Sequence, residues 1–256
     1  DISSHIKDLN PDFLNFETFA KLQNADLSNL PELSSNERIG SCITSPRKFI
    51  AIGLNYSDHA AEVGADIPKE PIVFMKATSC IVGPNDDVEI VSGSKKLDWE
   101  VELGIVIGKE AKHIAENQSQ DHILGYCLVN DVSEREWQLE KMGQWVKGKS
   151  HDTYGPVGPH LVTKDEIADV NNLKMSLDVN GKRMQTGNTS TMIFNVDVIV
   201  SYLSKYMTLL PGDIITTGTP PGVGMGMKPQ QFLKAGDMMK LSVENLGEQN
   251  SKVVAL

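Results

Sequence analysis

The sequence has few of the features that mark several common classes of protein. Its 256 residues include three cysteines, Cys42, Cys80 and Cys127, an odd and widely spaced set that builds neither a disulfide framework nor a zinc site. Free thiols indicate a reducing, cytoplasmic setting. We find no apolar run of transmembrane length and no signal-peptide pattern, so we expect no membrane association. The chain starts at Asp1 rather than at Met, so we expect natural residues to precede it.

Positive charge is also scarce. Lys and Arg number 24 against 34 Asp and Glu, which gives a formal net charge of -10. Non-specific nucleic-acid binding needs a basic surface, so the charge balance argues against a nucleic-acid partner. A hydrophobic fraction of 40% and a charged fraction of 23% are ordinary for a globular protein. The length allows one large domain with a small extension.

The character of the chain changes near residue 47. Residues 1–46 are polar and interrupted by proline, with one short helix expected near 16–22, and we predict a small N-terminal subdomain there. Residues 47–256 are expected to form the main domain. Strands are predicted at 49–53, 72–76, 88–91, 98–108, 125–131, 175–179, 213–217 and 239–243, and helices at 57–62, 133–142 and 197–207. This order predicts a β-rich α+β fold with mixed sheets rather than a doubly wound fold.

The segment 98–108 carries two acids in a predicted buried strand. Glu100 and Glu102 are two residues apart, so their side chains share one face of that strand. Burying two unpaired carboxylates side by side is very unfavourable. A divalent cation between them removes the penalty, and carboxylate oxygens suit Mg²⁺, Mn²⁺ or Ca²⁺. The alternative is an edge strand with a solvated acidic face.

Asp131 follows the apolar strand predicted at 125–131 and is a candidate third ligand. Three monodentate carboxylates would leave about three positions of an octahedral site open for substrate or water. The alternative role for Asp131 is that of N-cap to a helix starting near Ser133.

Lys149 lies in a segment bounded by Gly148 and by Gly155-Pro156. Such a lysine is usually solvated, but beside three carboxylates it could stabilise a developing enolate or carboxylate charge. Residues 143–150 also satisfy the P-loop pattern G-x-x-x-x-G-K-[ST]. A P-loop must follow a strand and open a helix. Here a helical segment precedes it and a Gly-Pro pair soon interrupts the chain, so we reject a nucleotide site.

His59 and Glu62 are three residues apart and share one face if 57–62 is helical. A carboxylate orients an imidazole and raises its basicity, which suits the activation of water. An exposed histidine near a helix start is the alternative.

Two further segments could bind a substrate carboxylate. Arg135 and Gln138 are three apart on the helix predicted at 133–142, where they face the same way toward either substrate or solvent. Thr219 lies in the Gly/Pro-rich loop 216–224 after a strand, whose N–H groups and hydroxyls could bind an anion. A plain turn is the alternative for this loop.

As an ordered set, these segments resemble the fumarylacetoacetate hydrolase family, over about residues 47–245. The first 46 residues look most like the bacterial branch labelled ureidoglycolate lyase, diketo-acid hydrolase or acylpyruvase. The matching segments are Gly53-Leu54-Asn55-Tyr56 with His59 and Glu62, Phe74-Met75-Lys76, Asp98-Trp99-Glu100-Val101-Glu102-Leu103, Asn130-Asp131-Val132-Ser133, Gly148-Lys149-Ser150, Gly187-Asn188-Thr189-Ser190, and Pro211-Gly212-Asp213 with Gly218-Thr219-Pro220.

The resemblance implies the family's mixed β-sandwich roll, a homodimer and a Mg²⁺ or Mn²⁺ site. It implies roles for most of the candidates: Glu100, Glu102 and Asp131 as metal ligands, Lys149 as the catalytic lysine, His59 and Glu62 as a water-activating pair on a mobile lid, and Thr219 as a contact to the substrate carboxylate. Arg135, Gln138 and Lys76 are further candidate substrate contacts. His151 departs from the pattern, because an aromatic residue is expected after Lys-Ser.

The expected activity is therefore metal-dependent hydrolysis of a carbon–carbon bond in a 2,4-dioxo acid, giving pyruvate and a second acid. Lyase chemistry on the same scaffold remains open: oxaloacetate decarboxylation, ureidoglycolate cleavage, or isomerisation or hydration of a hydroxydienoate. A non-enzymatic carboxylate-binding protein with this fold is the other alternative. In each case the expected partner is a small keto acid.

Overall fold

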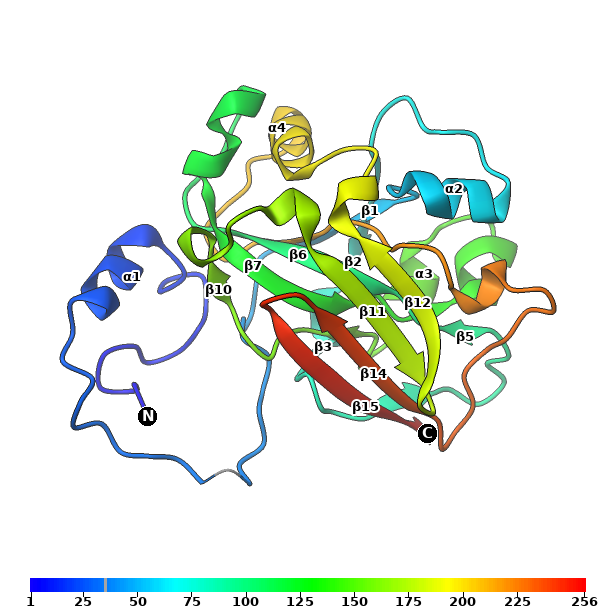
Figure 1. Cartoon of the computed structure of the whole chain (residues 1–256), viewed down its shortest axis with the longest axis horizontal. Helices are drawn as coiled ribbons and strands as arrows, with labels where there is room; N and C mark the ends of the chain where they lie inside the picture. Colours follow the sequence, from blue (N-terminus) through cyan, green and yellow to red (C-terminus); the bar gives the residue numbers. More distant parts are fainter. Residues whose placement is uncertain (35) are drawn as a thin grey trace.

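Two β-sheets packed face to face form the body of the molecule (Figure 1). The computed structural model describes residues 1–34 and 36–256. The six-stranded sheet has the order β10 (Val162–Thr163), β7 (Ile123–Asn130), β6 (Val101–Ile107), β13 (Ile214–Thr216), β1 (Phe49–Gly53) and β2 (Ile72–Lys76). The five-stranded sheet has the order β12 (Lys182–Asn188), β11 (Lys174–Val179), β14 (Met238–Val243), β15 (Gly247–Ala255) and β4 (Val88–Ile90).

Short elements complete the fold. β3 (Ile81–Val82) pairs with β9 (Gly155–Pro156), and β5 (Leu97–Asp98) pairs with β8 (Ser133–Glu134). The α-helices are α1 (Phe16–Gln23), α2 (Ser57–Val63), α3 (Val146–Lys149) and α4 (Val196–Tyr206), and a π-helix spans Glu136–Glu140. Within the described ranges, none of the helices is both long and apolar enough to cross a membrane.

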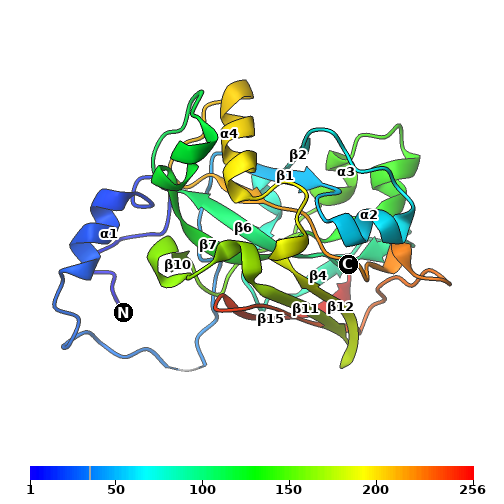
Figure 2. The ribbon, with the colours of Figure 1, turned by 45° about the horizontal axis from the view of Figure 1, so that its top comes forward.

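The six-stranded sheet is the middle layer of the molecule. Figure 2 shows α4 above it and β11, β12 and β15 below it. α4 buries Val196, Ile199, Val200 and Leu203, which recur at the spacing of one helix face. Because this sheet is covered on both sides, every residue of β6 and β7 is buried. Polar side chains on β6 and β7 are therefore held away from water.

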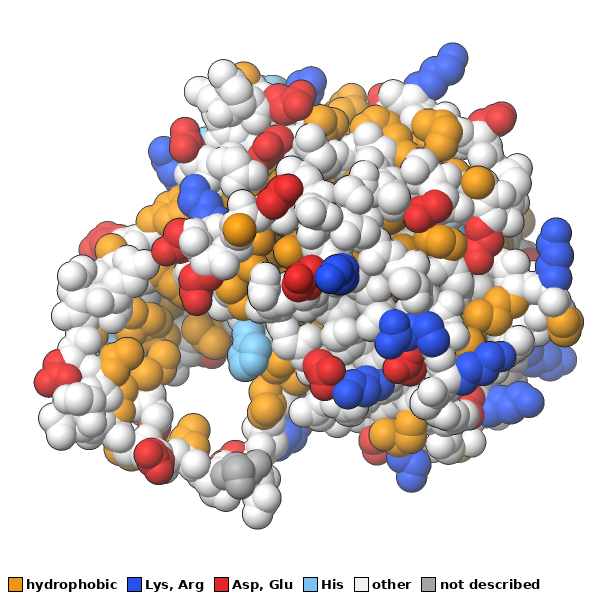
Figure 3. Space-filling view, viewed as in Figure 1, with side chains coloured by type: hydrophobic (Ala, Val, Ile, Leu, Met, Phe, Trp, Pro, Cys, Tyr) orange, Lys and Arg blue, Asp and Glu red, His pale blue; other side chains and the backbone are white. Residues whose placement is uncertain are grey.

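The five-stranded sheet has one buried and one solvated face. In β14, Met239, Leu241 and Val243 are buried while Lys240 between them is exposed, the alternation typical of a half-buried strand. Acidic and basic side chains intermingle on the molecular face that carries this sheet (Figure 3).

The predicted β-rich α+β fold is confirmed, with mixed sheets and few helices. Most predicted elements agree with the structure to within a residue or two. The helix predicted at 133–142 is wrong, because that segment forms β8 and then the π-helix. The strand predicted at 98–108 is divided into β5 and β6, with Glu100 just before β6. Within the two large sheets, β10, β12 and β15 lie outside the predicted strand ranges.

The N-terminal segment lies at the end of the molecule opposite α2 and α3 (Figures 1 and 2). It contains α1, and its Leu14 and Ile43 are buried in the same hydrophobic core as Phe49 of β1. The subdomain boundary at residue 46 stays a prediction.

Candidate active site

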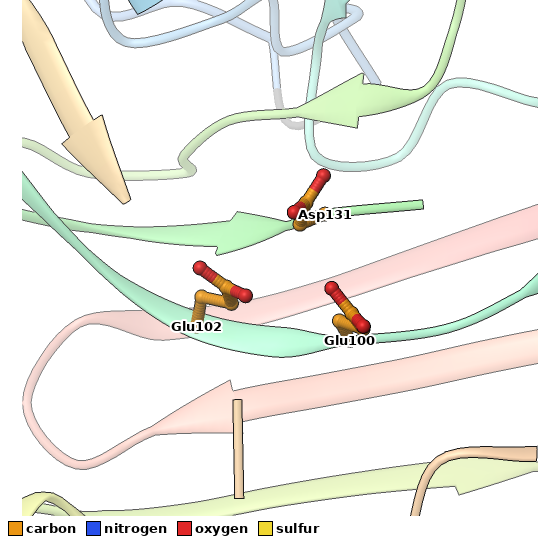
Figure 4. A group of neighbouring side chains, drawn as sticks. All are labelled: Glu100, Glu102 and Asp131. Atoms are coloured by element: carbon orange, nitrogen blue, oxygen red, sulfur yellow. The ribbon is translucent and has the colours of Figure 1, made fainter. Parts of the chain in front are cut away.

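Three carboxylates meet where β6 begins and β7 ends. The two strands are antiparallel and Val101 pairs with Asn130, so the start of one lies beside the end of the other. Glu100 and Glu102 therefore point toward Asp131 (Figure 4). Each residue offers an oxygen within 4.8 Å of the others, and all three are buried, with exposed fractions of 6%, 2% and 1%.

This placement contradicts the simpler alternatives for these acids. β6 is an interior strand of the six-stranded sheet, so the pair does not form a solvated acidic edge. The Asp131 side chain does not cap a helix, because Ser133 and Glu134 form β8 and both carboxylate oxygens face lysines.

Buried cations offset part of the negative charge. The Nζ atom of Lys149 lies 2.5 Å from Glu100 Oε2 and 2.7 Å from Asp131 Oδ2. Lys76 Nζ lies 2.6 Å from Asp131 Oδ1 and donates a hydrogen bond to the Lys149 carbonyl oxygen. Both lysines are 2% exposed, so the solvated-loop alternative for Lys149 is wrong. Lys76 lies behind Asp131 and is not among the residues described as lining the cavity.

A glycine allows Lys149 to take this position. Lys149 is the last residue of α3, which packs against the segment 134–138. A Cβ on Gly148 would lie 2.4 Å from the Glu134 carbonyl oxygen, so any larger residue would push the helix away. The P-loop interpretation fails on the same geometry, since the lysine ends a short helix instead of preceding one.

The protonation of the two glutamates differs although they are neighbours. Burial opposes ionisation of Glu100, but Arg135 and Lys149 outweigh it and lower its pKa to about 2. Burial together with the charges of Asp131 and Glu100 raises the pKa of Glu102 well above its usual value. Glu102 Oε2 accepts a hydrogen bond from the Thr216 hydroxyl and a second one, of 2.9 Å, from the Gly218 N–H. A divalent cation would reverse the shift at Glu102 by favouring its carboxylate form.

His59 and Glu62 form a pair on α2. His59 Nδ1 lies 3.0 Å from Glu62 Oε2, and Glu62 Oε1 accepts a hydrogen bond from the Gly222 N–H at 2.9 Å. His59 is buried and lines the same cavity as the three carboxylates. The alternative of an exposed histidine is wrong. With Nδ1 occupied by Glu62, Nε2 is the ring nitrogen left for a reactant.

Arg135 and Gln138 lie together, as their spacing predicts, although on a π-helix turn. Arg135 Nη1 donates to Gln138 Oε1 at 3.0 Å. Arg135 Nε lies 2.8 Å from Asp98 Oδ2 and its Nη2 lies 2.7 Å from Glu100 Oε1. The guanidinium is thus held by two acids of the chain, and both Arg135 and Gln138 are buried in the cavity lining.

The loop after β13 is more than a plain turn. Thr219 lines the cavity, and its hydroxyl donates to the Val101 carbonyl oxygen at 2.9 Å and accepts from Gln185 Nε2 at 2.8 Å. The Thr219 hydroxyl hydrogen is therefore already used within the protein.

Asp98 and Gln185 support the site residues through hydrogen bonds and were not predicted to do so. Asp98 accepts from the Gly224 and Met225 N–H groups, at 2.7 and 3.0 Å, besides pairing with Arg135. Its position beside the two glutamates in the sequence was the available signal. No pattern in the sequence indicated a role for Gln185, because it reaches the site from β12, a strand of the other sheet.

The site residues surround a cavity of about 210 Å³. Its lining combines the three carboxylates, His59, Arg135, Gln138, Lys149 and Thr219 with apolar side chains. A larger, open hollow of about 950 Å³ lies between segments 90–95, 179–184 and 230–237. None of the described site residues lines it, so we place the chemistry in the smaller cavity.

Comparison with known proteins shows which family the chain belongs to. The sequence profile of the fumarylacetoacetate (FAA) hydrolase C-terminal domain matches residues 48–254. The chain belongs to the fumarylacetoacetate hydrolase family. A Burkholderia lata protein, named only provisionally as a hydrolase, is 57% identical over 250 residues, which are 97% of this chain and 89% of the relative.

Solved structures of the fumarylacetoacetate hydrolase family have the same fold. The enzyme of Exiguobacterium antarcticum is 36% identical with a TM-score of 0.88, covering 100% of this chain and 91% of its own. A 2-hydroxyhepta-2,4-diene-1,7-dioate isomerase of Mycobacterium marinum is 36% identical with a TM-score of 0.78, covering 90% and 82%. A maleylpyruvate hydrolase of Sphingobium sp. SYK-6, in complex with manganese(II) and pyruvate, is 30% identical with a TM-score of 0.81, covering 95% and 84%.

The buried acidic triad of this family member fits a divalent cation. Three carboxylates supply only hard oxygen donors, which Mg²⁺ and Mn²⁺ accept alike. A cation bound there would also counteract the burial and the repulsion from Asp131 and Glu100 that together raise the pKa of Glu102. Carboxylate oxygens alone therefore do not distinguish Mg²⁺ from Mn²⁺.

Proposed function

We propose that the protein hydrolyses the C3–C4 bond of a 2,4-dioxo acid, releasing pyruvate and a second acid. One observation carries the proposal: a metal-type triad of carboxylates lines the same cavity as His59, whose Nδ1 is paired with Glu62. The first supplies a site for an α-keto acid, and the second supplies a base for water. The manganese and pyruvate in the related maleylpyruvate hydrolase support the same assignment.

In this proposal Glu100, Glu102 and Asp131 hold Mg²⁺ or Mn²⁺. The bound ion would act as a Lewis acid for the 1-carboxylate and 2-oxo oxygens of the substrate. The Thr219 hydroxyl hydrogen is already donated to Val101, so we assign the contact with the substrate carboxylate to the Thr219 backbone N–H. Arg135 and Gln138 face the cavity and complete the polar lining.

His59 is the proposed general base. Glu62 holds its Nδ1, so Nε2 takes a proton from water as the oxygen attacks the C4 carbonyl. The C3–C4 bond then breaks: the acyl group leaves as a carboxylic acid, and the electron pair enters the enolate of pyruvate. The ammonium group of Lys149 stabilises the enolate charge. Protonation at C3 gives pyruvate and balances the reaction.

Decarboxylation or isomerisation on the same scaffold is the second candidate, favoured by the related isomerase. The His59–Glu62 pair favours hydrolysis, because decarboxylation needs no activated water. Homodimer formation and a cytoplasmic location stay predictions.

The test is product identification. The protein with Mg²⁺ or Mn²⁺ is incubated with acetylpyruvate and with oxaloacetate, and products are followed by proton NMR. Equal amounts of acetate and pyruvate from acetylpyruvate are expected. Release of CO₂ from oxaloacetate, with acetylpyruvate left intact, would replace the proposal with a decarboxylase.

A further inference from the structure

The cavity lining has two chemically distinct parts. The polar part contains the three carboxylates, His59, Arg135, Gln138, Lys149, Gly218 and Thr219. The apolar part contains Ile52, Leu54, Val63, Ile72, Phe74, Leu139, Trp145 and Met225. A substrate anchored at the triad must extend its other end along the apolar part.

The apolar part begins directly at the catalytic lysine. Lys149 Nζ lies 5.3 Å from the centroid of the Phe74 ring, and Phe74 meets Trp145 edge to face with centroids 5.3 Å apart. Trp145 and Ile72 both lie over Gly53, where a Cβ would be 2.4 Å from the indole ring and 3.5 Å from Ile72 Cγ2. Phe74, Trp145 and Ile72 thus form one continuous apolar wall that starts beside Lys149.

Part of this wall is open to solvent. Leu139 is 43% exposed, Ile72 37% and Val63 36%, although each lines the cavity. Large apolar side chains kept exposed beside a site commonly indicate a surface that a ligand covers. These three side chains therefore extend the apolar surface toward the cavity mouth.

Each cationic group of the cavity lining is already paired with an acid of the chain. Arg135 is paired with Asp98 and Glu100, Lys149 with Glu100 and Asp131, and His59 with Glu62. Among the described lining residues there is no further Lys, Arg or His to face a group on the apolar part. A second carboxylate carried on the substrate tail would lose water there without gaining a partner.

On the basis of the proposed function, we infer that the natural substrate is a 2,4-dioxo acid whose acyl tail is apolar and uncharged, an alkyl or aryl group. The enzymes related in structure include ones named for a 1,7-dioate and for maleylpyruvate, compounds with a carboxylate at each end. Such substrates would place their second carboxylate against the apolar wall. Phe74, Trp145, Ile72 and Leu139 are the specificity-determining residues.

The test compares 2,4-dioxo acids that differ only in the tail, with Mn²⁺ present. The panel is acetylpyruvate, a longer straight-chain acylpyruvate, benzoylpyruvate, and the straight-chain compound with a terminal carboxylate in place of its methyl group. We expect kcat/KM to rise on the order of fourfold for each added methylene and to fall about 100-fold or more for the carboxylate-ended compound. Equal or better turnover of that compound would overturn the inference.

Two variants test whether the apolar wall causes the preference for an uncharged tail. Leu139→Lys places a cation in the lining and is expected to raise the relative kcat/KM of the carboxylate-ended substrate by about tenfold or more. Met142→Lys is the matched control, because Met142 is 93% exposed and outside the lining, and the preference should stay as in the natural protein. An unchanged preference in a folded, active Leu139→Lys protein would contradict the inference.

The outcomes separate the two proposals. Turnover of acetylpyruvate with a preference for charged tails overturns only the inference about the tail. A metal-loaded, folded protein that cleaves no member of the panel overturns the proposed function and the inference with it.

Discussion

Lys149 holds its ammonium group 2.5 Å from Oε2 of Glu100, although the residues are 49 apart in the sequence and both are buried. Burial opposes the charge on Lys149, yet Asp131 and Glu100 raise its pKa above the usual value. A fixed positive charge therefore lies beside the triad at neutral pH.

Removing this charge should impair catalysis more than folding. We expect Lys149→Met to lower kcat about 100-fold or more, because a pre-positioned donor to the developing enolate is lost. Lys147→Met is the control, since Lys147 is on the same short helix but exposed. Steady-state kinetics on acetylpyruvate, with circular dichroism to monitor folding, make the measurement. A Lys149→Met enzyme as fast as the Lys147→Met enzyme would remove Lys149 from the mechanism.

Glu102 should govern metal affinity. Glu102→Gln keeps the shape of the side chain but removes one anionic ligand, so the Kd for Mn²⁺ should rise about tenfold or more. Electron paramagnetic resonance of free Mn²⁺ measures binding without depending on turnover. Glu110→Gln alters an exposed acid just past the other end of β6 and should leave Kd unchanged. Equal affinity in both variants would mean that the metal binds elsewhere.

His59 distinguishes hydrolysis from decarboxylation. His59→Ala should reduce hydrolysis of acetylpyruvate about 100-fold or more, because the base that activates water is gone. Any oxaloacetate decarboxylation measured in the natural protein should persist in the variant. If His59→Ala cleaves acetylpyruvate at the natural rate, the general base must be another group.

The low pKa of Glu100 predicts a loss of stability in acid. In the metal-free protein its folded pKa is about 2 against an ordinary 4.5. Above pH 4.5 the carboxylate is ionised in both states and its contribution is full. As pH falls from 4.5 toward 2, the unfolded chain takes up a proton that folded Glu100 does not. This proton uptake lowers the free energy of unfolding by about 3 kcal/mol.

Urea unfolding at pH 5 and pH 3 measures this linkage. Glu100→Gln cannot titrate, so its free energy of unfolding should fall less between the two pH values than that of the natural protein. Glu110→Gln, at an exposed acid, should fall as much as the natural protein. The same pH dependence in all three proteins would show that Glu100 is not held ionised.

Local spacing predicted the parts of the site that lie close together in the sequence. The two-residue period of a strand put Glu100 and Glu102 on one face, and the helical period paired His59 with Glu62. Contacts between distant segments, such as Glu62 with Gly222 and Lys76 with Asp131, depend on which strands are neighbours in the sheets. No periodicity in the sequence contains that information.

Two errors in the predicted elements have physical causes. The segment 133–142 is rich in helix-forming residues, but β8 pairs with β5 and overrides that propensity. β15 has little apolar alternation, because its buried face carries the polar Gln249 and Ser251. Gln249 Nε2 donates to the carbonyl oxygens of Leu128 and Gly158, at 3.0 and 2.9 Å. A strand whose buried side chains are polar escapes a search for hydrophobic periodicity.

Metal-dependent release of pyruvate from acetylpyruvate tests the central claim most directly. The protein is stripped with a chelator, assayed, and assayed again after one equivalent of Mn²⁺ or Mg²⁺ is added, with lactate dehydrogenase and NADH reporting pyruvate. We predict a stripped protein without activity and recovery on addition of either metal. Full activity after exhaustive chelation would contradict the account, as would an inert protein under every metal condition.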